Sequence, residues 1–237
     1  LSMMIILFWF SLILLCAVYL MYPVVLFLVN RCVKKHTFDK SYTPSVTLIV
    51  PVYNEESIIK NKILNCLAVD YPRDKYEIIV VSDGSSDGTN AIIQKYEQQR
   101  LIRGLFLTRG GKLYALKKAV EIASGEILVM SDASAFLEPE TLKNLTGYFV
   151  NKKVGIVSGV EKIKSGIGGI SKSEGLYWRY ETKIKEWEGN AGVGISANGP
   201  LYAIRKYLFP SALAEKKNLC DDFAVSMSVV TALRIVI

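Results

Sequence analysis

The stretch EILVMSDAS, residues 126–134, decides how this chain can fold. Residues 127–130 form an unbroken apolar run, which is typical of a strand buried on both faces inside a parallel sheet. The run stops at Asp132, and in open α/β sheets the carboxyl end of a strand borders the crevice where ligands bind. A single Asp at this point is explained equally well as a cap of the next helix. Whether neighbouring strands end in the same way distinguishes the two interpretations.

The chain before this stretch repeats the same pattern. Apolar runs predict strands at 46–52, 77–81 and 105–107, and apolar residues at helical spacing follow each of them. Alternating strands and helices predict an α/β fold, a mostly parallel sheet with flanking helices and right-handed crossovers. The segments that this topology brings to one sheet edge are 51–55, 83–85, Lys112 and 132–134.

The loop SDGSSDGT, residues 82–89, allows three interpretations. A calcium loop needs a bidentate Glu at its closing position, and Gln94 stands there instead, so calcium is excluded. A plain turn would use Asp87 as the cap of the following helix. A ligand loop would use Asp83 to accept hydrogen bonds from a base or ribose, with Gly84 allowing a close backbone approach. The last two interpretations stay open on the residues alone.

The segment RGGK, residues 109–112, resembles a phosphate loop without being one. A P-loop would need Gly in place of Phe106 and Ser or Thr in place of Leu113, and no GxGxxG follows any predicted strand. Lys112 at a helix start still suits an anion, because the ammonium and the helix N-terminus both favour negative charge. The alternative is a solvated loop charge.

The first 30 residues carry no charge and exceed the roughly 20 residues that span a bilayer. They predict a transmembrane helix, because a signal peptide would be shorter and preceded by a basic residue. Arg31, Lys34 and Lys35 follow directly, which predicts a cytoplasmic globular part. Residues 31–45 are expected to be a juxtamembrane linker. The chain does not begin with Met, so further sequence is expected upstream.

Charge and cysteine content restrict the partners. The net charge of +7 lies entirely outside the first 30 residues and suits phosphates or lipid headgroups. Nucleic acid is not expected, because no dense Lys/Arg block is interleaved with aromatic residues. The four cysteines show no CxxC spacing, which argues against a metal cage and favours a reducing compartment.

Four motifs in order, VPVYNEE, VVSDGSSDGT, RGGKLYAL and MSDAS, give the chain a close resemblance to the family 2 glycosyltransferases. The resemblance implies a GT-A-type, Rossmann-like fold with a nucleotide-sugar-binding half at 46–135. Residues 136–237 would then be an acceptor-binding half, and the chain looks truncated at its C-terminus. The residues implied in nucleotide-sugar binding are Pro51, Val52, Tyr53, Glu55, Asp83, Ser85, Lys112, Asp132 and Ala133.

The resemblance also implies a divalent cation, Mg²⁺ or Mn²⁺, at an Asp-x-Asp element. This chain departs from that element, because Asp132 is followed two residues later by Ser134 rather than by a second Asp. A hydroxyl is a poorer ligand for these cations than a carboxylate. The cation is therefore expected to be held through Asp132, water and the diphosphate, with Ser134 as a second candidate ligand.

The second half offers another strand, at 154–160, and the acceptor side. Trp178, Glu181, Ile184 and Trp187 form a stripe at helical spacing, which favours packing over a sugar platform. The segment 194–205, GISANGPLYAIR, resembles the floor of the family's acceptor site.

Asp221 and Asp222 are explained either as helix caps or as catalytic acids. By resemblance, Asp222 is the general base and Asp221 supports it.

The function expected from these features is that of a membrane-anchored inverting glycosyltransferase. It would move a sugar from a nucleotide-sugar donor, with UDP-sugar expected, to a saccharide or lipid-linked acceptor. Its expected location is the plasma membrane. Two alternatives remain, namely an inactive nucleotide-sugar-binding subunit or fragment, and a sugar-phosphate nucleotidyltransferase.

Overall fold

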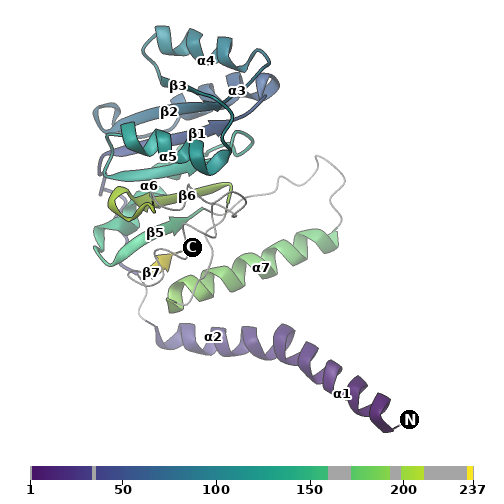
Figure 1. Cartoon of the computed structure of the whole chain (residues 1–237). Coiled ribbons are helices and arrows are strands. Elements are labelled where there is room, and N and C mark those ends of the chain that lie inside the picture. The colour runs from purple at the N-terminus through teal and green to yellow at the C-terminus, as the bar shows by residue number, and fades with distance from the viewer. Residues whose placement is uncertain (1, 34–35, 160–171, 193–198, 211–233, 237) are drawn as a thin grey trace.

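A computed structural model describes residues 2–33, 36–159, 172–192, 199–210 and 234–236. Its centre is one seven-stranded sheet with the strand order β3-β2-β1-β4-β6-β5-β7 (Figure 1). Every neighbouring pair is parallel except the two pairs that involve β6, so β6 alone among these strands runs against the others. The strands are β1 (Val46–Val52), β2 (Tyr76–Asp83), β3 (Arg103–Leu107), β4 (Ile127–Ser131), β5 (Val154–Ser158), β6 (Leu201–Arg205) and β7 (Arg234–Val236).

Helices cover both faces of this sheet. The crossovers of the first half each carry one α-helix, as the strand–helix alternation predicts. The α-helices are α1 (Ser2–Cys16), α2 (Tyr22–Cys32), α3 (Glu56–Leu67), α4 (Thr89–Gln98), α5 (Lys112–Ile122), α6 (Thr141–Thr146) and α7 (Lys172–Ala191). A π-helical turn, η1 (Ala17–Met21), joins α1 to α2, and the 3₁₀ turns are η2 (Arg73–Lys75), η3 (Gly147–Val150) and η4 (Lys206–Leu208).

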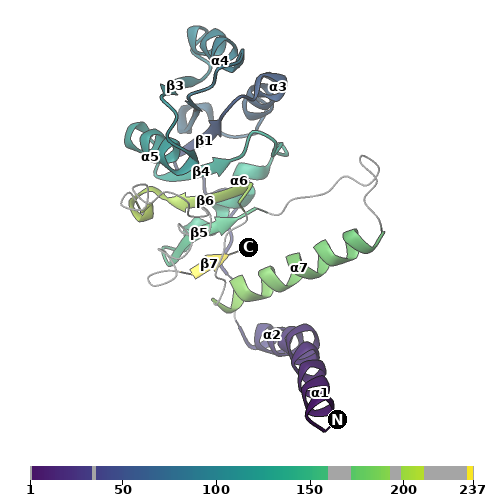
Figure 2. The ribbon, with the colours of Figure 1, turned by 45° about the vertical axis from the view of Figure 1, so that its right-hand side comes forward.

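Two apolar cores lie on opposite faces of the sheet. Alternate side chains of β1 decide which core they enter, because successive side chains of a strand point to opposite faces. Leu48 and Val50 pack with α3, α4 and α6, whereas Ile49 packs with α5 on the other face. Figure 2 shows α5 and α3 on opposite sides of the strands. The central strands are therefore covered on both faces, as their apolar runs predict.

The predicted strands are confirmed, with small differences at their ends. The second strand is longer than predicted and ends at Asp83 itself, because Asp83 pairs in register with Leu107 of β3. The fifth strand is shorter than predicted and ends at Ser158. The antiparallel strand β6 was not predicted from the sequence. It lies between β4 and β5, so both halves of the chain contribute to a single sheet.

The apolar N-terminal segment is helical from Ser2 to Cys32 and extends away from the sheet (Figure 1). Its length of 31 residues, with a mean hydropathy of 2.7 over an 18-residue window, would allow it to cross a membrane. Its second part, α2, packs against α7. The rings of Phe27 and Trp187 lie 5.6 Å apart, and Asn30 Nδ2 donates to the carbonyl of Trp187 at 2.9 Å. At Trp187, the aromatic stripe of α7 therefore serves packing.

Candidate active site

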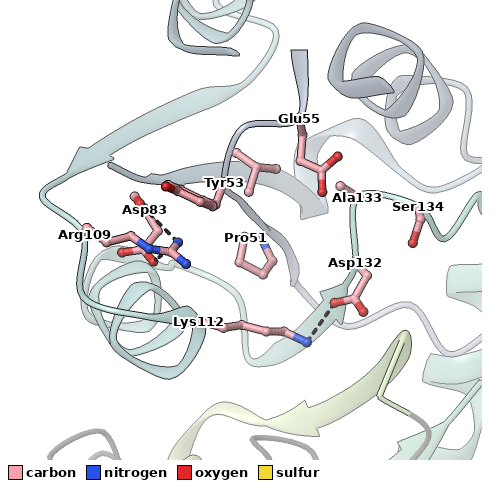
Figure 3. A pocket seen from close by; sticks show the side chains of 10 residues that line it. Pro51, Tyr53, Glu55, Asp83, Arg109, Lys112, Asp132, Ala133 and Ser134 are labelled. Atoms are coloured by element: carbon pink, nitrogen blue, oxygen red, sulfur yellow. Dashed lines mark hydrogen bonds and ion pairs between the residues drawn. The ribbon is translucent and has the colours of Figure 1, made fainter. Parts of the chain in front are cut away.

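A pocket of about 300 Å³ lies at the carboxyl edge of the parallel strands (Figure 3). Three strand ends build it, because β1, β2 and β4 run side by side in the same direction. Figure 3 shows side chains from all three strand ends around one hollow. The residues that line the pocket are Pro51, Val52, Tyr53, Glu55, Asp83, Arg109, Lys112, Asp132, Ala133 and Ser134.

One end of the pocket is built around the carboxylate of Asp83, which is 3% exposed. It accepts three hydrogen bonds from the loop after β3. Gly110 N donates to Oδ1 at 2.7 Å, while Gly111 N and Arg109 Nη1 donate to Oδ2 at 2.9 and 2.8 Å. Two carboxylate oxygens offer about four acceptor positions. The described contacts therefore leave about one of them for a ligand.

Arg109, in the loop after β3, also contacts Tyr53 on the wall of the pocket. The guanidinium carbon of Arg109 lies 3.4 Å from the ring centroid of Tyr53, a cation–π contact between the loop after β3 and the turn after β1. Gly84 makes this approach feasible, because its φ is +74° and an added Cβ would lie 2.7 Å from the backbone nitrogen of Arg109. The Asp83 end is thus held by charge, by hydrogen bonds and by close packing.

The other end of the pocket is built around Asp132, and it is more open. The Asp132 side chain is 34% exposed and pairs with the ammonium of Lys112 at 2.9 Å. Its backbone N–H donates to the carbonyl of Pro200 at 3.0 Å, and the turn after it is closed by Ala135 N, which donates to the carbonyl of Asp132 at 3.2 Å. Lys112 begins α5, as predicted.

The loop 82–89 combines the two interpretations that its sequence left open. Asp87 caps two helices, since its carboxylate accepts from the backbone N–H of Glu56 at the start of α3 and of Thr89 at the start of α4, both at 3.1 Å. Asp83 lines the pocket. Ser85 does not line it, because its hydroxyl accepts from the backbone N–H of Asn54 at 3.1 Å and so fastens two loops together.

The structure brings together nearly all of the predicted site residues, although their binding roles stay predictions. Eight of the nine predicted nucleotide-sugar residues line the pocket, together with Ser134, and Ser85 lies outside it. Arg109 was missed by the sequence analysis. Its signal was available, because it follows a strand end at the same sheet edge. Asp221 and Asp222 lie outside the described residues.

The Asp132 end offers oxygen ligands for a divalent cation. No group of three or more His, Cys, Asp or Glu residues that could hold a metal occurs in the described part of the chain. Mg²⁺ in particular is often held by one or two carboxylates, with waters and substrate phosphates completing its coordination. The Asp132 carboxylate and the Ser134 hydroxyl fit such a site, whereas they would not make a cage formed by protein alone.

A second lysine, Lys62, contacts the residues on either side of 132–134. Lys62 of α3 is fully buried, and its ammonium donates to the hydroxyl of Ser131 at 2.7 Å and to the carbonyl of Ala135. Burial lowers its pKa, and the nearby Cys66 and Asp132 oppose that shift. No pattern in the sequence indicates a role for Lys62.

Known proteins similar to this chain are glycosyltransferases. It is 31% identical over 118 residues to a β-monoglucosyldiacylglycerol synthase of Trichormus variabilis, covering 48% of this chain and 25% of that protein. It is 26% identical over 220 residues to the probable glycosyltransferase YdaM of Bacillus subtilis, covering 87% of this chain and 50% of that protein. The chain thus spans half or less of the length of these relatives.

A solved structure and a family model agree with these relatives. The mannosyltransferase PcManGT from Pyrobaculum calidifontis, solved in complex with GDP-Man and Mn²⁺, superimposes with a TM-score of 0.75 at 28% identity, covering 94% of this chain and 64% of that one. The model of "Glycosyl transferase family 2" matches residues 47–203, more than half of the chain and all of the pocket described above. This chain therefore belongs to glycosyl transferase family 2.

Proposed function

We propose that this protein is a membrane-anchored, inverting glycosyltransferase that moves a sugar from a nucleotide-sugar donor to a saccharide or lipid-linked acceptor. The observation that carries the proposal is the contrast within one pocket. An enclosed carboxylate, Asp83, stands at one end, and an open carboxylate beside a lysine, Asp132 with Lys112, stands at the other. A nucleoside diphosphate has the matching chemistry, with N–H and hydroxyl donors at one end and anionic phosphates at the other.

The nucleoside is assigned to the Asp83 end. The remaining acceptor position of Asp83 suits an N–H of the base or a ribose hydroxyl, and Tyr53 and Arg109 stack beside it. Pro51 and Val52 at the end of β1 supply the floor. We expect uridine as the base. GDP is the competitor to test, because the similar mannosyltransferase was solved with GDP-Man.

The diphosphate is assigned to the Asp132 end. Lys112 at the start of α5 offers an ammonium, and the helix N-terminus adds further favourable potential for phosphate oxygens. Asp132 and Ser134 would hold Mg²⁺ or Mn²⁺, which when bound neutralises charge on the departing diphosphate. Lys112 pairs with Asp132 in the structure. Donor and cation together would separate this pair and give each side chain a new partner.

Asp222 is assigned as the general base, with Asp221 in support. In an inverting transfer the base takes the proton of the acceptor hydroxyl while that oxygen forms a bond to the anomeric carbon. The bond from the anomeric carbon to the diphosphate breaks on the opposite face, and the nucleoside diphosphate leaves with the bonding electrons. Both residues lie outside the described part of the chain, so this assignment rests on the family resemblance.

The N-terminal helix is assigned as the membrane anchor. It carries no charge before Arg31, which lies in its last turn, and Lys34 and Lys35 follow it in the sequence, which favours a cytoplasmic catalytic domain, with the plasma membrane as the expected location. A membrane anchor would keep the pocket close to lipid-linked acceptors. The glucosyldiacylglycerol synthase among the relatives makes diacylglycerol an acceptor worth testing.

Purified protein in detergent tests the proposal through two readouts. UDP and GDP binding is measured by calorimetry with Mn²⁺ and with EDTA, and release of the nucleoside diphosphate is measured from UDP-glucose, UDP-N-acetylglucosamine and GDP-mannose with diacylglycerol or oligosaccharide acceptors. We expect tight binding that needs the cation, together with acceptor-dependent release. Binding without release would favour an inactive subunit, and absence of any binding would overturn the proposal.

A further inference from the structure

Lys62 is a buried cation that packing alone does not explain. It lies on α3 between Ile59 and Ile63, on the face of the helix that enters the core, and its side chain is 0% exposed. Lysine is almost never fully buried unless its ammonium has partners, because removing an unpaired ion from water is unfavourable whereas burying an apolar group is favourable. An apolar residue of similar length would fill this space. The ammonium therefore points to a role for its contacts.

Those contacts bracket the open end of the pocket. Ser131, the last residue of β4, accepts from Nζ at 2.7 Å, and Ala135 accepts through its carbonyl. Between these two residues lie Asp132, Ala133 and Ser134, whose side chains line the pocket in Figure 3. One ammonium thus joins the residue before this three-residue segment to the residue after it, and Lys62 is not among the residues that line the pocket.

Other contacts also hold residues 132–134, and they differ from those of Lys62. Asp132 N donates to Pro200 and Ala135 N closes the turn onto the carbonyl of Asp132. The Asp132 carboxylate also pairs with Lys112, and the Ser131 hydroxyl itself donates to the carbonyl of Asp132 at 3.5 Å. Asn65, one turn further along α3, holds Leu137 through two hydrogen bonds of 2.8 Å, beyond the end of the segment. Lys62 therefore restrains the two residues that flank the segment, whereas Asn65 restrains Leu137, two residues beyond Ala135.

We propose that Lys62 is a positioning residue, which holds the Asp132–Ser134 turn in the conformation that presents its carboxylate and hydroxyl to the cation and diphosphate. This inference rests on the proposed function, because it assumes that the turn binds them. Groups that orient metal ligands, without themselves binding the metal, strongly affect metal affinity. Losing one typically costs about 10- to 100-fold in affinity.

Lys62→Met tests the inference, because methionine keeps the length and removes the donor. The measurement is UDP affinity with Mn²⁺ and with EDTA. We expect the gain in affinity that Mn²⁺ provides to fall about 10- to 100-fold, with the affinity in EDTA nearly unchanged. Lys60→Met removes an exposed lysine of the same helix, and Asn65→Ala removes the neighbouring restraint. Both should keep the Mn²⁺ gain within about twofold of wild type, since neither touches the turn.

Ser131→Ala is measured alongside and keeps the test decisive even if Lys62→Met does not fold. It removes one acceptor of Lys62 and should lower the Mn²⁺ gain in the same direction by a smaller factor. An unchanged gain in Ser131→Ala, or an equal loss in Lys62→Met and Asn65→Ala, would overturn the inference.

Hydrogen exchange of the ligand-free protein separates this inference from the proposed function. A peptide that covers residues 131–137 should exchange faster in Lys62→Met than in wild type or Lys60→Met, whether or not any nucleotide binds. Faster exchange in Lys62→Met, but no Mn²⁺-dependent binding in wild type, would contradict the proposed function and leave the restraint by Lys62 intact. Equal exchange in all three proteins would overturn the restraint itself.

Discussion

The two carboxylates of the pocket stand at equivalent points of the sheet but in opposite surroundings. Asp83 ends β2 and Asp132 follows β4, each at the carboxyl edge of a parallel strand. Asp83 is 3% exposed and accepts three hydrogen bonds, whereas Asp132 is 34% exposed and pairs with one lysine, Lys112, at 2.9 Å. The same residue type at the same kind of strand end therefore lies in two different environments.

The difference shows at which end of the pocket the protein itself supplies most of the hydrogen-bond partners of the carboxylate. The Asp83 end is already assembled, because the loop after β3 supplies its partners. The Asp132 end has free coordination capacity, which in the proposed function the cation and the diphosphate use. Changes at Asp83 should therefore affect stability and nucleoside binding, and changes at Asp132 should affect the metal-dependent part of binding.

The largest expected effect concerns Asp222, the proposed general base, which lies outside the described residues. Asp222→Asn keeps the size of the side chain and removes the proton acceptor, so sugar transfer should fall by roughly 100- to 10,000-fold. UDP affinity, with or without Mn²⁺, should stay nearly unchanged, because both ends of the pocket are intact. Initial rates and calorimetry measure the two quantities. Transfer close to the wild-type rate would show that Asp222 is only a helix cap.

The next effect concerns the open end. Asp132→Ala should abolish the dependence of UDP binding on Mn²⁺, because the cation would lose its charged ligand from the turn. The thermal unfolding midpoint should stay close to that of wild type, since the carboxylate is partly exposed and its pair with Lys112 is a surface ion pair. Calorimetry and thermal unfolding measure this together. A large drop in the midpoint would mean that Asp132 is structural in the way Asp83 is.

The enclosed end should behave in the opposite way. Asp83→Asn removes the charge and replaces one acceptor oxygen with an amide donor, so at least one of the three hydrogen bonds is lost, and bonds to charged groups each contribute about 1.5–3 kcal/mol. The free energy of unfolding should fall by about 2 kcal/mol, which lowers the midpoint by roughly 4–8 °C in a protein of this size. UDP affinity should weaken equally with Mn²⁺ and with EDTA. Unchanged stability would contradict the description of this end as assembled.

The smallest effects concern Ser134. Ser134→Ala should weaken Mn²⁺-dependent UDP binding only slightly, because water can occupy the place of a neutral hydroxyl. Ser134→Asp restores the family's second carboxylate and should tighten Mn²⁺ binding, with slower release of the nucleoside diphosphate as a consequence. Titration of Mn²⁺ against UDP binding compares the two variants. If Ser134→Ala proves as damaging as Asp132→Ala, the hydroxyl is a direct ligand or a structural pin.

Much of the fold could be predicted from sequence because its signals are local. The apolar runs at 46–52 and 127–130 predict buried strands, and the strand–helix alternation predicts their parallel arrangement. The antiparallel insertion of β6 between β4 and β5 is a long-range pairing, and the local pattern of residues 201–205 carries no information about its neighbours. The order of the strands in the sheet was thus less predictable than the positions of the strands in the sequence.

The site was predictable to a similar extent and for similar reasons. The carboxyl ends of parallel strands meet at one sheet edge, so the strand–helix alternation places Asp83 and Asp132 at the same edge, and the strand order β2-β1-β4 brings them into one pocket. Arg109 was missed because a loop arginine looks solvated until its loop is seen to close over Asp83. Lys62 was missed because a lysine in an apolar stripe gives no sign of its partners, which come from residues about 70 positions away.

The central claim is that one nucleotide occupies both ends of this pocket, and that the cation acts at one end alone. Calorimetric titration of wild-type protein with uridine and with UDP, each with Mn²⁺ and with EDTA, tests it most directly. We predict that uridine binds weakly and equally under both conditions, and that UDP binds much more tightly when Mn²⁺ is present. Equal UDP affinity with Mn²⁺ and with EDTA, or an equal effect of Mn²⁺ on uridine, would contradict the claim.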